Sequence, residues 1–271
     1  MHGTESHGKV CLRGNRDNTL LGIKMYTPYF IEKEDLKFFK KIVETQGLRR
    51  GYKLHCHLMA FISNWQNRKH LREQLVQTIE QQYKKKLPSE QKKTLLTPGV
   101  PPQLPFASVS VSHCAFLGGF VISPSGSLNT PSSSLKLAFV KQPFIGFDLE
   151  QLGRAKEKTL LRISNKKELS DIPSPSALWS AKEAAYKSIS SLQRDTHIKH
   201  ISIFGWQPVS SIENIKAAKP NISKKLEREE KESPKIYDYQ FIIKEKNIKG
   251  EGFVCCLNNV VIGLAFSKSR R

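Results

Sequence analysis

The nine residues from 179 to 187, WSAKEAAYK, hold the pattern around which the rest of the chain can be arranged. As a helix, they place Trp179, Glu183 and Lys187 on one stripe, because residues four apart are neighbours on a helix surface. The stripe begins with a large aromatic ring and continues with an acid and a base. This pattern predicts a functional site on one face of the helix.

A second motif, IGFDLE, lies upstream at residues 145–150. The segment alternates with a period of two, so that a strand turns Asp148 and Glu150 to the same face. Together with Glu183 they supply three carboxylates, and Lys187 lies one helical turn further on. Carboxylate oxygens are suitable ligands for Mg²⁺. The sequence therefore predicts a site for Mg²⁺ and a phosphate chain.

Periodic apolar residues predict helices at 32–46, 64–87 and 174–192. Gly47 is a natural stop for the first helix. Ser174 and Pro175 open the third, because serine is a good N-cap and proline is favoured at the first helical position. A proline-rich connector is expected at 88–105, and a helical or irregular segment at 156–170.

Apolar runs predict strands at 54–62, 107–122, 135–140, 144–150, 198–204, 239–246, 252–257 and 260–267. The last three form an antiparallel meander in which Asn258 and Asn259 make a tight turn. The serine-rich residues 123–134 indicate a flexible hairpin tip. Helices followed by strands, twice along the chain, predict an α+β protein with two similar-sized halves.

The expected organisation begins with a flexible polar arm at residues 1–19. An N-terminal α+β half covers 20–140, and a C-terminal α+β half covers 141–271. Residues 215–235 are dense in charge and predict a solvated insertion within the C-terminal half.

The charge of the chain is unusual. Its 44 Lys and Arg against 24 Asp and Glu give a net charge of +20, which attracts an acidic protein, nucleic acid or an anionic membrane without choosing among them. The five cysteines contain no Cys-x-x-Cys pair and suggest no disulfide framework. The polar N-terminus favours no secretory signal, and no apolar run is long enough to span a membrane. We therefore expect a soluble protein of the reducing cytoplasm.

Together the motifs resemble those of the 4′-phosphopantetheinyl transferase superfamily. The first is Gly-x-Asp-x-Glu, present as Gly146 to Glu150, and the second is Trp-x-x-Lys-Glu-Ala-x-x-Lys, present as Trp179 to Lys187. A third segment, VSVSH at 109–113, is similar to the Ser-His segment that precedes the aspartate motif in the family. Each motif is weak evidence alone, but all three occur in the family's order.

The resemblance implies an enzyme that moves the phosphopantetheine arm of coenzyme A onto a serine of an acyl or peptidyl carrier protein and releases adenosine 3′,5′-bisphosphate. The chain length is similar to the long, single-chain type, represented by the surfactin-synthetase activator. That type implies a monomeric pseudo-dimer of two similar halves, each a small antiparallel sheet with a packed helix. Coenzyme A is then expected in a cleft between the halves.

The resemblance also assigns roles to the residues. Asp148, Glu150 and Glu183 are the expected Mg²⁺ ligands, and Glu183 is the expected base for the carrier serine. Lys187 is expected to stabilise or protonate the leaving phosphate oxygen. The expected contacts to coenzyme A are Ser112, His113, Lys182 and Lys187, and the basic clusters with Arg49 and Arg68 are candidates for its 3′-phosphate or for the acidic carrier.

Two other functions compete with this one. A catalytically silent homologue would bind coenzyme A as a scaffold, although the intact carboxylates and Lys187 argue against it. A nucleic-acid-binding protein is suggested by the charge alone, but no recognition helix, RNP pattern or zinc module is visible. No membrane or nucleic-acid partner is therefore expected.

Overall fold

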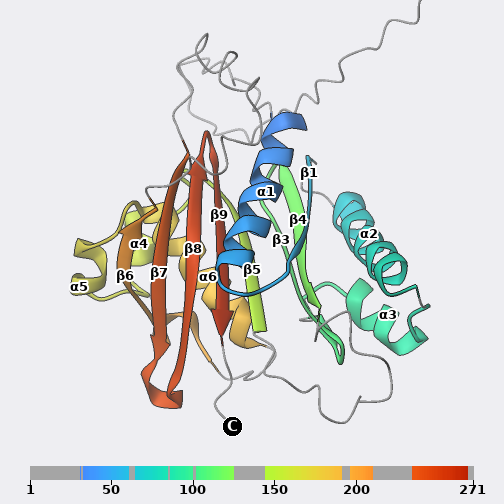
Figure 1. Cartoon of the computed structure of the whole chain (residues 1–271). Coiled ribbons are helices and arrows are strands. Elements are labelled where there is room, and N and C mark those ends of the chain that lie inside the picture. The colour runs from blue at the N-terminus through green and yellow to red at the C-terminus, as the bar shows by residue number, and fades with distance from the viewer. Residues whose placement is uncertain are drawn as a thin grey trace, which may run out of the picture.

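The computed structural model describes residues 31, 33–60, 65–84, 86–99, 102–124, 144–190, 196–209 and 234–267. Within these ranges the chain folds into helices and two antiparallel sheets, which confirms the predicted α+β class (Figure 1). None of the described helices is both long and apolar enough to cross a membrane. The expected arm at 1–19, the strand at 135–140 and nearly all of the charged insertion at 215–235 lie outside the described residues.

The first sheet has the strand order β1-β4-β3-β2. Its strands are β1 (His55–Ala60), β2 (Gln103–Leu104), β3 (Ala107–His113) and β4 (Leu117–Pro124). The second sheet has the order β5-β9-β8-β7-β6. Its strands are β5 (Phe144–Gln151), β6 (Ile201–Pro208), β7 (Lys235–Ile243), β8 (Ile248–Leu257) and β9 (Val260–Ser267).

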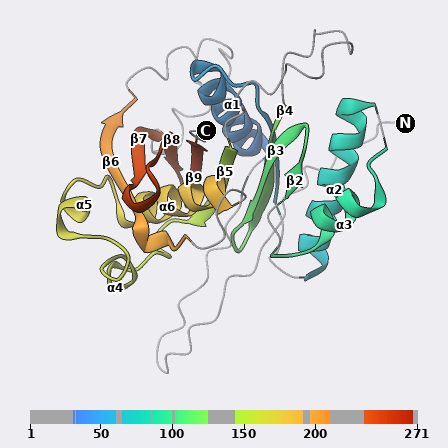
Figure 2. The same cartoon turned by 90° about the horizontal axis from the view of Figure 1, so that it is seen from below.

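The helices cover both sheets and fill the space between them (Figures 1 and 2). They are α1 (Lys33–Arg49), α2 (Trp65–Tyr83), α3 (Ser89–Leu96), α4 (Glu157–Leu160), α5 (Lys166–Ser170) and α6 (Pro175–Ser190). The 3₁₀ turns η2 (Ile198–His200) and η3 (Lys244–Lys246) flank strands of the second sheet.

Three apolar clusters hold these layers together. The central cluster packs α1 residues such as Phe39 and Ile42 against Phe147 of β5 and against other residues of both sheets. A second cluster joins α6 to the opposite face of the second sheet, and a third joins α2 and α3 to the outer face of the first sheet. In Figure 2, α2 and α3 cover the outer face of the first sheet and α6 covers one face of the second, while the two sheets meet at an angle with α1 packed against both.

The two sheets are also joined by hydrogen bonds from the edge of one to side chains of the other. The amide groups of Ile145, Phe147 and Leu149 on β5 donate to the hydroxyls of Ser108, Ser110 and Ser112 on β3, over 2.9, 2.8 and 3.0 Å. Alternate residues of a strand point to the same side, so the three serines face β5 together. We call this set the serine ladder. It satisfies the outward N–H groups of an edge strand inside the protein, where unpaired donors are costly.

Two predictions about helices are wrong. The first helix does not stop at Gly47 but continues to Arg49. Gly47 instead permits close packing, because a Cβ there would lie 2.5 Å from the Leu54 side chain. The expected proline-rich connector contains α3, which lies between Pro88 and Pro98. The prolines at 88 and 98 favoured an irregular connector in the sequence. They lie just outside the helix, where proline is tolerated, and so do not disrupt α3.

The strands β5 and β9 lie where they were predicted, whereas β6 and β7 are displaced by three or four residues from 198–204 and 239–246, and β8 begins four residues before 252. The strand expected at 107–122 is in fact the hairpin β3–β4, closed by a bond from the Cys114 amide to the Leu117 carbonyl. The meander is confirmed, with Asn258 in its tight turn at a positive φ of 52°. The helical or irregular segment expected at 156–170 contains α4 and α5.

The serine ladder predicts a measurable loss of stability. Ser110→Ala removes the hydroxyl that accepts the buried Phe147 amide hydrogen. We expect the free energy of unfolding, measured by urea denaturation, to fall by about 1–3 kcal/mol, because a buried donor loses its partner. Ser108→Ala is the matched control and should cost less, since its bond is only partly buried. Wild-type stability in Ser110→Ala would contradict the role of the ladder.

Candidate active site

The candidate site forms where α6 lies unusually close to β5 and β9. Glycine at two strand positions allows this approach: a Cβ on Gly146 would overlap the Ala184 carbonyl oxygen, and one on Gly263 would lie 2.6 Å from the Ser180 hydroxyl. The Ser174 hydroxyl accepts the Ala177 amide hydrogen at 3.2 Å, which confirms the predicted N-cap of α6.

Asp148 and Glu150 lie on the same face of β5 as Gly146, because residues two apart in a strand share a face. That face is turned toward α6, whereas the intervening Phe147 and Leu149 belong to the central apolar cluster. Both carboxylates are therefore buried next to the helix that carries Glu183 and Lys187.

Three segments meet at the Asp148 carboxylate. Its Oδ1 accepts hydrogen bonds from Lys187 Nζ at 2.7 Å and from Ser112 Oγ at 3.1 Å. Lys187 Nζ also donates to Ser112 Oγ at 2.9 Å, and the Leu149 amide donates to the same hydroxyl. The structure thus brings together one residue from each of the three sequence motifs.

Ser112, which the sequence assigned to coenzyme A, makes its contacts here within the protein. A hydroxyl donates one hydrogen bond and accepts two. Ser112 donates to Asp148 and accepts from Leu149 and Lys187, so its capacity is filled within the protein. In this structure Ser112 positions Asp148 and Lys187, and its contact with coenzyme A stays a prediction.

Glu150 and Glu183 lie in the same electrostatic environment. Burial raises the pKa of Glu183 above its ordinary value, Lys187 opposes this shift, and the negative charges of Asp148 and Glu150 add to it. Burial also raises the pKa of Glu150, against the effects of its hydrogen bond from the Gln151 amide and of the nearby Arg154. Such shifts are typical of carboxylates gathered in a functional site.

Arg154 is a member of the site that sequence reasoning missed. Its Nη1 lies 3.4 Å from Glu150 Oε1, and its side chain is 64% exposed. Arg154 lies four residues beyond Glu150, just after β5, so proximity to the Gly-x-Asp-x-Glu motif was the available signal. An exposed cation beside buried carboxylates is well placed to meet an anionic substrate.

The carboxylates fit Mg²⁺ by the chemistry of their atoms. Asp148 Oδ2 is buried and has no hydrogen-bond partner among the described residues. A cation beside this oxygen would compensate for the missing bond, and hard oxygen donors suit Mg²⁺. Within the described part of the chain, however, no three acidic, histidine or cysteine side chains are placed to hold a metal as they lie. The described site therefore offers suitable donors but no preformed cage.

The positive charges of basic side chains act on the imidazole of His113 on β3. Burial lowers the pKa of His113, and the positive charge of Arg68 on α2 is the next largest cause. Lys187 and Arg154 lower this pKa further, so four basic side chains share one region. The assignment of His113, Arg68 and Lys187 to coenzyme A stays a prediction.

The Arg49 side chain contacts its own helix and not the described residues around Asp148. It is exposed at the end of α1, where its Nη1 donates to Gln46 Oε1 at 3.1 Å. Its neighbour Arg50 is the residue that turns inward: Nη2 donates to Asp238 Oδ1 on β7 at 2.5 Å, and the guanidinium lies 5.5 Å from the Phe253 ring centroid. Arg50 therefore fastens α1 to the second sheet.

The prediction that Lys182 contacts coenzyme A is wrong. Its side chain is fully buried, with Nζ 2.8 Å from Glu168 Oε1 and 2.5 Å from the Ile201 carbonyl oxygen. Burial lowers the pKa of this ammonium group, and Glu168 opposes the shift by stabilising the charge. On α6, Lys182 lies about 100° from Glu183, since successive residues are offset by that angle. It joins α6 to α5 and β6 instead of facing the substrate.

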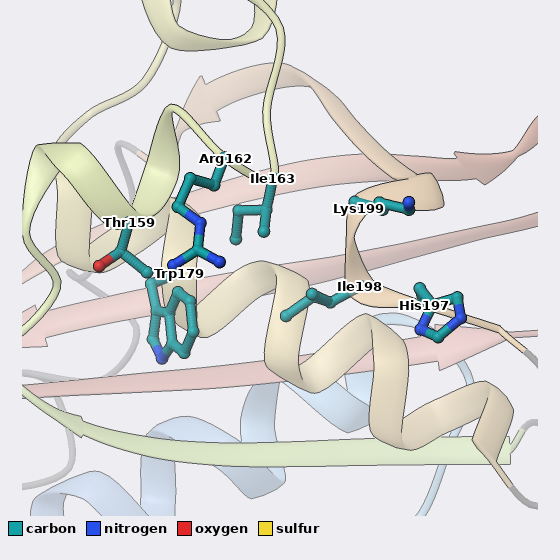
Figure 3. A pocket seen from close by; sticks show the side chains of 7 residues that line it. All are labelled: Thr159, Arg162, Ile163, Trp179, His197, Ile198 and Lys199. Atoms are coloured by element: carbon teal, nitrogen blue, oxygen red, sulfur yellow. The ribbon is translucent and has the colours of Figure 1, made fainter.

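The Trp179 side chain contacts both the apolar core and a surface pocket. It packs partly against the second apolar cluster, as expected for a core anchor. It also lines a pocket of about 390 Å³ together with six other residues (Figure 3). These are Thr159, Arg162, Ile163, His197, Ile198 and Lys199. Sequence reasoning did not find this pocket, because its walls come from three separate segments.

No model of a known protein family matches the chain, and no curated protein matches it.

The buried ion pair predicts that Lys182 supports stability. Lys182→Met leaves the Glu168 carboxylate buried without its cation. We expect the free energy of unfolding to fall by about 3–5 kcal/mol in urea denaturation, the usual cost of breaking such a pair. The double variant Lys182→Met/Glu168→Gln should recover part of this loss, because the second substitution removes the unpaired negative charge. The structural assignment of Lys182 would be contradicted by a single variant as stable as the wild type.

Proposed function

We propose that this protein is an Mg²⁺-dependent 4′-phosphopantetheinyl transferase. It takes the phosphopantetheine arm from coenzyme A, attaches it to a serine of an acidic acyl or peptidyl carrier protein and releases adenosine 3′,5′-bisphosphate. The observation that supports this proposal most is the contact of Ser112, Asp148 and Lys187. These residues come from three motifs that resemble those of one enzyme family, and they lie within 3.1 Å of one another.

The reaction displaces a phosphate leaving group at phosphorus. Lys187 is well placed to stabilise the charge that develops on the leaving oxygen, because its ammonium group is fixed by Asp148 and Ser112 and is partly exposed. Glu183, next to it on α6, is the group that accepts the proton from the carrier serine, directly or through water. Fixing both groups on one helix limits the reorganisation needed at the moment of reaction.

Asp148, Glu150 and Glu183 would hold Mg²⁺ in this proposal. When bound, the ion would neutralise the pyrophosphate of coenzyme A and the charge that develops during transfer. His113, Arg68 and Arg154 provide further positive or polar groups for the phosphates, and Lys187 faces the same region.

The proposal also includes the finer architecture. We infer a monomeric pseudo-dimer of two similar halves, with coenzyme A between them and Asp148 at the seam. The meeting of β3 and β5 through the serine ladder supports a site between the two sheets. A cytoplasmic location would give the enzyme access to coenzyme A and carrier proteins.

Intact mass spectrometry tests the proposed reaction. An apo acyl carrier protein, and separately an apo peptidyl carrier protein, are incubated with this protein, coenzyme A and Mg²⁺. We expect the mass to rise by one phosphopantetheine, and EDTA to prevent the gain until excess Mg²⁺ is added. If neither carrier gains mass, the proposed reaction is wrong, and a thermal shift with coenzyme A then identifies a silent binder.

Glu183→Gln tests the proposed base. The substitution keeps the size of the side chain but removes its ability to accept a proton, so we expect transfer to fall by at least about 10²-fold, within the range of general-base contributions. Binding of coenzyme A, measured by calorimetry, should be largely retained. Glu90→Gln on α3 is the matched control, because Glu90 is exposed and lies on the side of the molecule away from α4 and α6 (Figure 1). Wild-type turnover in Glu183→Gln would exclude Glu183 as the base.

A further inference from the structure

The pocket beside Trp179 is separate from the carboxylates yet built on the same helix. Its floor and walls include Trp179 of α6, Ile163 after α4 and Ile198 of η2 (Figure 3). Trp179 precedes Glu183 by four residues, which is a rise of about 6 Å along the helix axis. The pocket and the proposed base are therefore carried by one helix, one turn apart along its axis.

The lining of the pocket combines apolar surface with positive charge. Arg162 and Lys199 are exposed cations, and His197 is an exposed imidazole. None of the seven lining residues, all within the described ranges, is acidic. In Figure 3 the side chains of Arg162 and Trp179 both line this pocket. A ligand that fits this pocket would have an apolar group to contact the tryptophan and isoleucines, and negative charges to pair with the cations.

The surface around the pocket also combines an exposed apolar side chain with exposed basic residues. Leu161, next to Arg162, is 57% exposed, which is unusual for a large apolar side chain. Exposed lysines at positions 156, 158, 166 and 167 lie on α4, α5 and the turns beside them. An open pocket with an apolar centre and a charged rim has the anatomy of a protein interface.

We propose that this pocket is the docking site of the acidic carrier protein and receives one apolar side chain from it. Carboxylates of the carrier then face Arg162 and Lys199 on the rim, and the carrier serine is directed toward Glu183. This inference rests on the proposed function, since it names where that function's protein substrate binds. Burial of one anchor side chain gives affinity, and the rim charges give orientation and a faster encounter.

Two variants separate the anchor from the charges. Thr159→Trp fills the pocket without changing charge, and Thr159 is exposed, so the substitution does not disturb the core. If this variant fails to fold, Thr159→Phe fills much of the same volume. Arg162→Glu/Lys199→Glu reverses the charge of the rim. Lys86→Glu/Lys93→Glu is the matched control, because these exposed lysines lie beside or on α3, on the opposite side of the molecule (Figure 1).

Binding is measured by calorimetry with an acyl carrier protein whose acceptor serine is replaced by alanine, so that no transfer occurs. We expect Kd to rise by about tenfold or more in Thr159→Trp and in Arg162→Glu/Lys199→Glu, as for a central anchor and for close charge pairs. The control should bind within about twofold of the wild type. Added salt should weaken wild-type binding more than binding by the charge-reversed variant.

The alternative outcomes are distinct. Unchanged binding by Thr159→Trp, or no binding by the wild type, would overturn the docking site. If binding is lost only in the charge-reversed variant, the carrier does not insert an apolar side chain into the pocket. Arg162 and Lys199 would then be a general binding surface for polyanions, including nucleic acid. Pocket-dependent binding without transfer to the unmodified carrier would retain the docking site but refute the proposed reaction.

Discussion

Three serine hydroxyls on β3 accept the amide hydrogens of β5, and the rest of the structure depends on this contact between two sheets. An edge strand inside a protein must satisfy its outward N–H groups, and pairing with another strand is the usual solution. Here the side chains of Ser108, Ser110 and Ser112 replace that strand. Because the serines recur every second residue, they also fix the register of one sheet relative to the other.

The last serine of the ladder connects the fold to the chemistry. Ser112 reaches Asp148 and Lys187 as well as the Leu149 amide, so the geometry of the sheet contact is passed directly to a buried acid and an amine on α6. Gly146 fixes the other side of the arrangement by letting α6 lie against β5. The same strand thus meets a second sheet at its edge and a helix on its face, and Asp148 lies where the two contacts converge.

Periodicity predicted most of the helices and strands, but it missed α3, the division of 107–122 into β3 and β4, and several of the contacts. The pattern of α6 placed Glu183 and Lys187 on one stripe, and the alternation in β5 placed Asp148 and Glu150 together. The burial of Lys182 was not predictable, because it depends on Glu168, whose placement follows from short helices with weak periodicity. The inward orientation of Arg50 was not predictable either, because its partner Asp238 is 188 residues away in the chain. Long-range pairs of this kind leave no local signal.

The most direct test of the account compares Ser112→Ala with Ser112→Thr in unfolding and in transfer to a carrier. We predict that Ser112→Ala loses stability and also loses turnover by about 10²-fold, because Lys187 and Asp148 lose their shared hydroxyl and small misplacements have large effects on rate. Ser112→Thr keeps a hydroxyl and should recover much of the turnover. Wild-type turnover in Ser112→Ala would show that the contact between the sheets does not set the site, and would contradict the account.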